Sequence, residues 1–143
     1  MTLYNKVEIR KTNNYFGVFA INTIEKGEVI FKINTDIIVE KPSKYSVQIA
    51  KSKHVEPPTN IDITDKPDYF WRFLNHNCEP NSFCNLKDMT FNALRDIKKG
   101  EHITFNYLTT EYDMSSPFKC NCNSKNCFGL IKGYKYLSEK ERP

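Results

Sequence analysis

Residues 72–83 read RFLNHNCEPNSF. The segment leaves an apolar run, WRFL at residues 71–74, and passes at once into amides, an imidazole and a thiol. Polar groups are tolerated in a protein core where each has a hydrogen-bond partner. The segment therefore predicts a polar cluster set into the core, with partners supplied from elsewhere.

The composition is that of one folded domain. With 143 residues, 39% of them hydrophobic and 13% aromatic, the chain can bury a core without disulfides. It has no apolar run of about 20 residues, the length of a membrane span, and its charged N-terminus does not resemble a secretory signal. We therefore expect an intracellular protein, nuclear or cytoplasmic, with no membrane partner and with reduced or metal-bound cysteines.

The formal charge is +4, and the basic excess lies in residues 118–142. A basic C-terminus next to several cysteines is compatible with a small zinc-stabilised nucleic-acid-binding domain. However, the chain has no dense run of Lys and Arg with interleaved aromatic residues, as such surfaces have. We expect a solvated basic surface and no direct nucleic-acid binding.

Short β-rich segments recur along the chain with turn residues between most of them. They lie at residues 6–10, 17–21, 28–33, 37–40, 45–50, 90–94 and 102–107. The pattern predicts a mostly β domain with short strands. Residues 67–74, PDYFWRFL, predict a short helix or turn, and residues 51–68, polar with three prolines, predict a surface loop.

One sequence motif occurs twice. Residues 24–30, IEKGEVI, are matched by residues 97–103, IKKGEHI. In each copy we expect Lys-Gly to form a tight turn with the glycine at positive φ, followed by a strand that begins at Glu. The repeat predicts two similar turns and by itself indicates no function.

Three cysteines, Cys120, Cys122 and Cys127, form a dense cluster. Three thiolates so close together cannot all pair with one another, but they can bind one tetrahedral zinc ion. The fourth ligand of a structural zinc site must come from elsewhere. Cys78 and Cys84 are the only other cysteines, and a histidine is a further candidate. Cys78 would tie the C-terminal segment to the polar segment at 72–83.

Four stretches, taken in order, resemble the SET domain of protein lysine methyltransferases, over residues 6–137. They are NNYFGVFAINTIEKGEVI (13–30, the N-terminal segment), RFLNHNCEPN (72–81, the Asn-His-x-Cys-x-Pro-Asn signature), ITFNY (103–107, the catalytic-tyrosine strand) and the cysteine cluster with GLIKGYKYL (129–137, the post-SET segment).

The resemblance implies a mostly β SET-domain fold of small curved sheets with a C-terminal pseudoknot that brings Asn75-His76 beside Tyr107. It implies a SET domain over residues 1–114 with a variable insert at about 50–68, a short post-SET zinc-binding segment at 115–137, and a tail at 138–143. The zinc ligands expected from the cysteines and the resemblance together are Cys78, Cys120, Cys122 and Cys127.

The activity implied is that of an S-adenosylmethionine-dependent protein-lysine N-methyltransferase acting on a histone or another protein. Methyl transfer from a sulfonium needs no acid, so the site must align donor and acceptor and present a neutral amine. The resemblance places Tyr107 at the methyl-transfer end of a lysine channel and Tyr45 along it. Phe105 stands where the family uses Phe or Tyr, and Phe implies room for di- or trimethylation.

The cofactor site implied by the resemblance is built from both halves of the chain. The expected contacts are the backbone of Phe16, Gly17 and Val18, then Asn75, His76 and Tyr107, with Phe128 or Leu130 covering the adenine. One departure stands out, because the Gly-x-Gly of the family reads Tyr15-Phe16-Gly17 here. His54 and His102 are expected to have structural roles only.

A catalytically silent SET-like module that binds a protein through the same groove is the alternative. The presence of Tyr107, Asn75, His76 and the cysteine cluster argues against it, because a binding module needs no methyl-transfer tyrosine. The target protein and lysine do not follow from the sequence.

Overall fold

The computed structural model describes residues 6–143, so the start of the expected domain, residues 1–5, lies outside the described residues. The described chain is mostly β, as predicted, and no helix within it is long and apolar enough to cross a membrane. Its elements are β1 (Val7–Thr12), β2 (Tyr15–Ala20), β3 (Val29–Lys32), β4 (Ile38–Val39), β5 (Val47–Ala50), β6 (Lys53–Val55), the 3₁₀ helix η1 (Pro67–Phe73), β7 (Asn75–His76), β8 (Ser82–Asn85), β9 (Thr90–Ala93), β10 (His102–Phe105), η2 (Tyr107–Thr109), β11 (Phe118–Lys119), β12 (Leu130–Ile131) and η3 (Tyr134–Tyr136).

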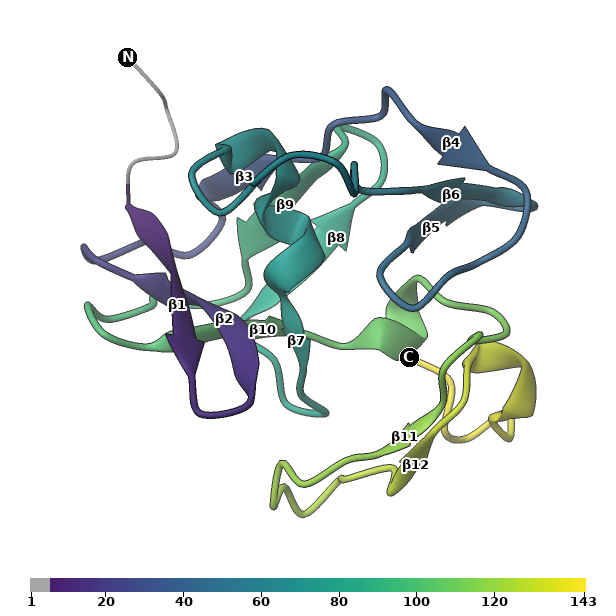
Figure 1. Ribbon diagram of the computed structural model, residues 1–143. Helices are drawn as coiled ribbons and strands as arrows, with labels where there is room; N and C mark the ends of the chain where they lie inside the picture. The colour runs from purple at the N-terminus through teal and green to yellow at the C-terminus, as the bar shows by residue number, and fades with distance from the viewer. Residues whose placement is uncertain (1–5) are drawn as a thin grey trace.

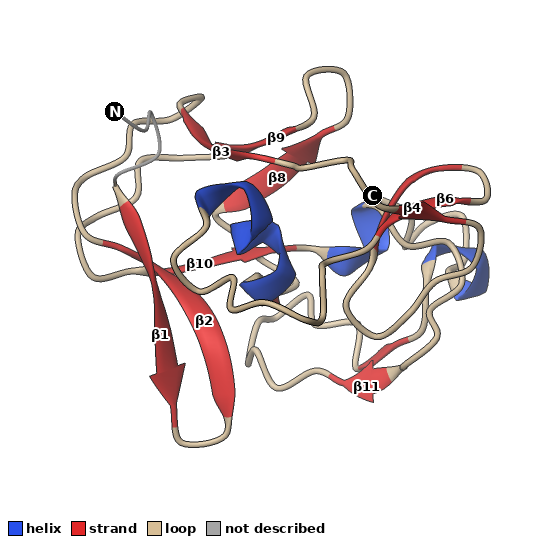
Figure 2. Cartoon of the chain, turned by 45° about the horizontal axis from the view of Figure 1, so that its top comes forward, coloured by secondary structure: helices blue, strands red, loops and turns tan. Residues whose placement is uncertain are grey.

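The strands form four small sheets, in the orders β1-β2-β10-β7, β3-β9-β8, β4-β6-β5 and β11-β12. Figure 1 shows the β4-β6-β5 sheet at one end of the molecule and the β11–β12 hairpin along its lower edge. The 3₁₀ helix η1 lies near the centre in both overall views (Figures 1 and 2). The sheets are small because turn residues interrupt the chain every few positions.

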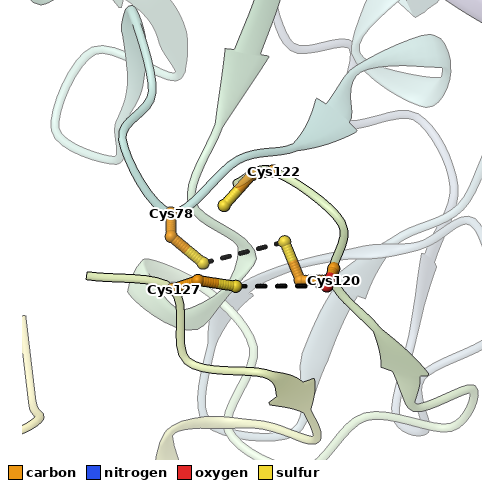
Figure 3. Close-up of side chains that lie close together, drawn as sticks. All are labelled: Cys78, Cys120, Cys122 and Cys127. Atoms are coloured by element: carbon orange, nitrogen blue, oxygen red, sulfur yellow. Dashed lines mark hydrogen bonds between the residues drawn. The ribbon is translucent and has the colours of Figure 1, made fainter. Parts of the chain in front are cut away.

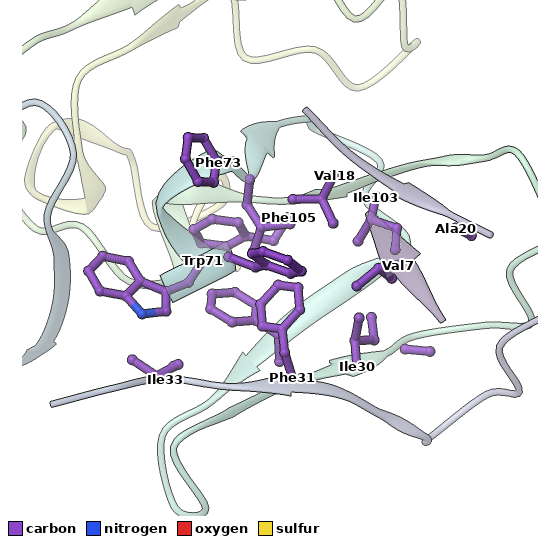
Figure 4. Close-up of a cluster of buried hydrophobic side chains, with 14 of the residues drawn as sticks. Val7, Val18, Ala20, Ile30, Phe31, Ile33, Trp71, Phe73, Ile103 and Phe105 are labelled. Atoms are coloured by element: carbon purple, nitrogen blue, oxygen red, sulfur yellow. The ribbon is translucent and has the colours of Figure 1, made fainter. Parts of the chain in front are cut away.

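The core forms where η1 meets the sheets. The helix begins at Pro67, a residue favoured in the first turn, and buries Phe70, Trp71 and Phe73. The Trp71 indole Nε1–H donates to the Asp68 carbonyl at 2.8 Å, so its one polar atom is paired. Figure 4 shows Trp71 and Phe73 in one cluster with buried aliphatic side chains of the strands. The short helix predicted at 67–74 is confirmed.

The signature segment joins the main sheet through its first two polar residues. β7 pairs in parallel with β10, with Asn75 opposite Thr104 and His76 opposite Phe105. Because β10 leads directly to Tyr107, this pairing confirms the expected placement of Asn75-His76 beside that tyrosine.

The repeated motif forms a pair of matched turns that contact each other. Ile24 and Ile97 form an isolated antiparallel bridge, with N–H···O distances of 2.9 and 2.8 Å. Gly27 and Gly100 have φ values of +86° and +92°, as predicted for these turns.

The strands after these turns begin one residue later than predicted, at Val29 and His102. The reason is that the preceding glutamates close the turns with their side chains. The Glu28 carboxylate accepts the backbone N–H of Glu25 at 3.1 Å, and that of Glu101 accepts the N–H of Lys98 at 2.6 Å.

The prediction of a surface loop over residues 51–68 is wrong in its first part. Lys53–Val55 forms β6, the central strand of its sheet, and His54 and Val55 are buried. His54 therefore lies in a strand rather than in a polar loop. A three-residue strand next to prolines carries no visible alternation, and it forms only because β4 and β5 pair with it on both sides.

The side chain of Asn81 replaces a strand partner for β10. Its Nδ2 donates to the His102 carbonyl and its Oδ1 accepts from the Thr104 N–H, both at 2.9 Å.

Asn81→Ala leaves both buried groups unpaired, and we expect it to lower the free energy of unfolding by about 3 kcal/mol, measured by urea denaturation. Asn22→Ala, at an exposed position, should change it by less than about 0.5 kcal/mol. Equal urea midpoints for the two variants would contradict this role.

Candidate functional site

The four predicted cysteines converge at one point. The Sγ atoms of Cys78, Cys120, Cys122 and Cys127 all lie within 4.8 Å of one another, and Cys78 and Cys120 are 3.8 Å apart (Figure 3). Four thiolates around one zinc at about 2.3 Å would be separated by about 3.8 Å, so the cluster fits a tetrahedral ion. Cys84 lies in β8 and is not a member, which leaves Cys78 as the fourth cysteine.

The surroundings of the cluster act in opposite directions on the ionisation of its thiols. Backbone N–H groups of Phe128 and Gly129 donate to the sulfurs of Cys78 and Cys127, each at 3.4 Å. Burial raises the pKa of Cys78, so this thiol would need a nearby cation to ionise. Desolvation also raises the pKa of Cys122, but hydrogen bonds from the backbone and the neighbouring thiols outweigh it and bring the value to about 7.

His76 connects the cysteine cluster to Tyr107. Its Nδ1 accepts the backbone N–H of Tyr107 at 3.0 Å, so the ring proton must be on Nε2, which lies 3.3 Å from the sulfur of Cys78. Burial lowers the pKa of His76 to about 4, so the ring is neutral at physiological pH. Both ring nitrogens are thereby occupied, and only the ring faces and the backbone remain for the predicted contact with a cofactor.

Asn75 links β7 to the N-terminal segment. Its Nδ2 donates to the Phe16 carbonyl at 2.9 Å and lies 3.1 Å from Nε2 of His102. A carbonyl can only accept, which fixes the orientation of the amide, and Nε2 of His102 must then be the unprotonated ring nitrogen. The amide oxygen of Asn75 receives no hydrogen bond from the described residues. It is therefore an acceptor that a ligand can use.

Gly17 is required for space rather than for an unusual backbone conformation. A Cβ at this position would lie 2.8 Å from Nε2 of His102 and 2.9 Å from the Phe19 ring, so these two rings would have to move to accommodate any other residue. The Phe19 and His102 rings stack with their centroids 4.7 Å apart. His102, expected to be structural only, thus lies against both Asn75 and Gly17, two residues of the predicted cofactor site.

The other predicted cofactor residues differ in how accessible they are. The Val18 side chain is fully buried, so only its backbone can meet a ligand. Phe128 packs against the cysteine cluster, whereas Leu130 is 56% exposed on β12. Tyr15, at the position of the missing glycine, is half exposed with its ring 6.2 Å from that of His102. The cofactor roles of these residues stay predictions.

The three predicted catalytic residues line one narrow pocket. Its volume is about 60 Å³, which is enough for a few water molecules or the end of one extended side chain, and its wall includes Tyr45, Phe105 and Tyr107. The Tyr107 hydroxyl donates to the Leu74 carbonyl at 2.5 Å, and its ring packs on Phe105 with centroids 4.9 Å apart. Burial raises the pKa of Tyr107, helped by the charge of Glu111, so the phenol stays protonated.

Three charged residues in the pocket wall, Lys44, Arg72 and Glu111, had no predicted role. The Arg72 guanidinium carbon lies 3.4 Å from the centroid of the Tyr45 ring, a close cation–π contact. Glu111 is only 8% exposed. Arg72 is part of the signature and could have been singled out from the sequence, whereas nothing marks Glu111 except its position four residues after Tyr107.

Comparisons with known proteins agree with this arrangement. The family model described as SET domain matches residues 15–108. The chain is 35% identical to the methyltransferase flvH of Aspergillus flavus over 116 residues, which is 80% of this chain and 60% of that protein. It is 32% identical to the H3 lysine-36-specific histone-lysine N-methyltransferase of Saccharomyces cerevisiae over 145 aligned residues, which is 91% of this chain but 20% of that protein.

A solved structure shows the same fold. The methyltransferase domain of human histone-lysine N-methyltransferase SETMAR superposes with a TM-score of 0.61 at 18% identity, covering 89% of this chain and 58% of that one. The matched SET region is more than half of the chain and contains the signature, the pocket residues Phe105 and Tyr107, and the cofactor candidates Phe16 to Val18. This chain belongs to the SET domain family.

Proposed function

We propose that the protein is an S-adenosylmethionine-dependent protein-lysine N-methyltransferase that acts on a histone or another protein. The observation that carries the proposal is the narrow pocket lined by Tyr107, whose hydroxyl proton is already committed to the Leu74 carbonyl. The printed names of the relatives, a methyltransferase and a histone-lysine methyltransferase, support the reaction class.

The chemistry divides between the cofactor and the chain. S-adenosylmethionine, when bound, would supply a methyl group carried on a sulfonium. The sulfur is the leaving group and needs no protonation to leave. The free amide oxygen of Asn75 and the backbone at Phe16 and Gly17 suit the ammonium and carboxylate of its methionine part. We assign these residues, with His76, Val18 and either Phe128 or Leu130, to cofactor binding.

In the pocket lined by Tyr107, the protein has to orient the lysine amine. Because the Tyr107 hydroxyl donates to Leu74, its oxygen lone pairs remain to accept an amine N–H. That contact would direct the nitrogen lone pair along the line of transfer. The walls contributed by Phe105 and Leu74 are apolar and buried, which disfavours the charged form of the lysine.

We propose that Cys78, Cys120, Cys122 and Cys127 bind one structural zinc ion. A zinc there would fasten residues 115–137, the proposed post-SET segment, to the signature and its neighbour His76. The cofactor candidates Phe128 and Leu130 would be held in place through the same site.

Label transfer tests the proposal against the alternative of a silent binding module. The purified protein is incubated with methyl-labelled S-adenosylmethionine and two acceptor pools, core histones and the proteins of a total cell lysate. We expect label on lysine in at least one pool. Cofactor binding without label in either pool would favour the binding module.

Tyr107→Phe should leave the affinity for S-adenosylmethionine within about threefold and lower the methylation rate at least about 100-fold, because it removes the oriented hydroxyl. Calorimetry measures the first effect and label transfer the second. Tyr112→Phe is the matched control, since Tyr112 is half exposed and lies outside the Tyr107 pocket. A fully active Tyr107→Phe variant would remove this residue from the mechanism.

Phe105→Tyr should shift the product from di- or trimethyl-lysine towards monomethyl-lysine. Phe105 is buried in the pocket wall next to Tyr107, so an added hydroxyl takes up space that further methyl groups need. Mass spectrometry of the modified acceptor measures the product distribution. The same distribution in both proteins would show that Phe105 does not control it.

Cys122→Ser should lower the zinc content, measured by mass spectrometry of the metal, from one ion per chain to well below half. It should also speed hydrogen exchange in residues 115–137 and weaken cofactor binding, while β9 stays protected, because that strand lies in the separate core sheet. Cys84→Ala, outside the cluster, is the control and should keep its zinc. Retained zinc in Cys122→Ser would refute the site.

A further inference from the structure

A single carboxylate, that of Glu111, lines the Tyr107 pocket among the described residues. It lies outside the signature, and the roles assigned above leave it unused. A buried carboxylate needs compensating contacts, because desolvation disfavours its charged form. The contacts it makes therefore indicate what the group can do.

The two carboxylate oxygens of Glu111 have different surroundings. Oε2 accepts the backbone N–H of Gln48 at 2.9 Å and the hydroxyl of Thr110 at 2.7 Å. Oε1 receives no hydrogen bond from residues 6–143. Among these residues, Nδ1 of His54 is the only side-chain nitrogen or oxygen that is both fully buried and without a hydrogen-bond partner. Oε1 is therefore not sealed in the protein, and Glu111 forms part of the wall of the Tyr107 pocket.

The carboxylate is also held rigidly. The Glu111 N–H donates to the Tyr107 carbonyl at 2.9 Å, and its own carbonyl accepts from Tyr134 at 2.9 Å. On the other side, the Gln48 side chain accepts the N–H of Tyr112 at 2.9 Å, so β5 is bonded twice to this turn. Glu111 thus joins the Tyr107 turn, β5 and η3, of which the first two contribute to the pocket wall, and these bonds hold its carboxylate in place.

Five charged or titratable groups line the pocket together with Glu111 or lie close to its carboxylate. They are Arg72 from η1, Lys44 and Tyr45 from the segment before β5, Tyr107 from η2, and Cys84 from β8. Burial raises the pKa of Glu111, while the hydrogen bonds from Gln48 and Thr110 lower it, and burial prevails. A carboxylate with a raised pKa is a stronger base than one on the surface.

We propose that Oε1 of Glu111 accepts a proton from the ammonium group of the substrate lysine inside the pocket. The inference rests on the proposed function. The N–H bond breaks, its electron pair stays on the lysine nitrogen, and an O–H bond forms on Glu111. A positive and a negative group become two neutral ones, which a buried site favours. The nitrogen lone pair then takes the methyl group, and Glu111 later returns its proton to water.

The test is the pH dependence of kcat/KM for Glu111→Gln, which keeps an acceptor for Gln48 and Thr110. We expect a loss of about 100-fold at pH 7. The loss should shrink about tenfold for each unit of rising pH, because the variant must take up lysine that is already neutral and the lysine pKa is about 10.4. The wild-type profile should stay nearly flat from pH 7 to 9.

Two control variants and two measurements accompany this variant. All assays use the acceptor pool that the wild-type protein labels. Glu25→Gln, in an exposed turn, should match the wild type. Glu111→Asp keeps a carboxylate and should keep the flat profile even at a lower rate. The affinity for S-adenosylmethionine and the melting temperature show that the Gln variant is folded.

The outcomes distinguish a failure of this inference from a failure of the proposed function on which it rests. A loss in Glu111→Gln that is the same at every pH would mean a structural role and would overturn the proton transfer, as would no loss at all. A wild-type protein that binds the cofactor but labels neither pool would overturn the proposed function, and this inference with it.

Discussion

The parallel pairing of β7 with β10 is the contact on which the remainder of the site depends. It joins two residues, Asn75 and His76, to a strand that lies about thirty positions further along the chain. A pairing this short is weak by itself. Side chains and the adjacent backbone reinforce it. The hydroxyl of Ser82 donates to the Thr104 carbonyl at 2.7 Å, and the N–H of Asn77 donates to the Phe105 carbonyl at 3.1 Å.

The same pairing explains why the signature is polar. The polar side chains of the signature form hydrogen bonds with backbone groups, and in one case with a sulfur atom, that no neighbouring strand pairs with. Asn75 pairs with the Phe16 carbonyl, Asn81 with a carbonyl and an N–H of β10, and His76 with the Tyr107 N–H and the Cys78 sulfur. Apolar residues here would leave those groups unpaired at about 1–3 kcal/mol each. Polarity in this part of the core is therefore a requirement of a fold made from very short strands.

The sequence predicts those features that depend on local pattern or on residue chemistry. The strands with visible alternation, the helix after Pro67, both glycine turns and the four-cysteine cluster all follow from it. It does not predict β6, β7, β11 or β12, because strands of two or three residues exist only through their partners, and it does not predict the four-residue strand β8 either. Glu111 is missed for the same reason, and His102 is predicted only as a structural residue, since the role of a lone histidine or glutamate depends on what the fold places beside it.

Direct contacts connect the cysteine cluster, the Tyr107 turn, β5 and η3. His76 touches both the cysteine cluster and the turn that carries Tyr107, while Glu111 bonds that turn to β5 and to the C-terminal η3. The Tyr107 turn is thus held from the side of the cysteine cluster by a neutral imidazole and from the side of β5 by a carboxylate. Only the second of these groups faces the pocket. The imidazole can fix geometry, whereas the carboxylate can also exchange a proton, and that difference separates a residue that supports the pocket from one suited to act within it.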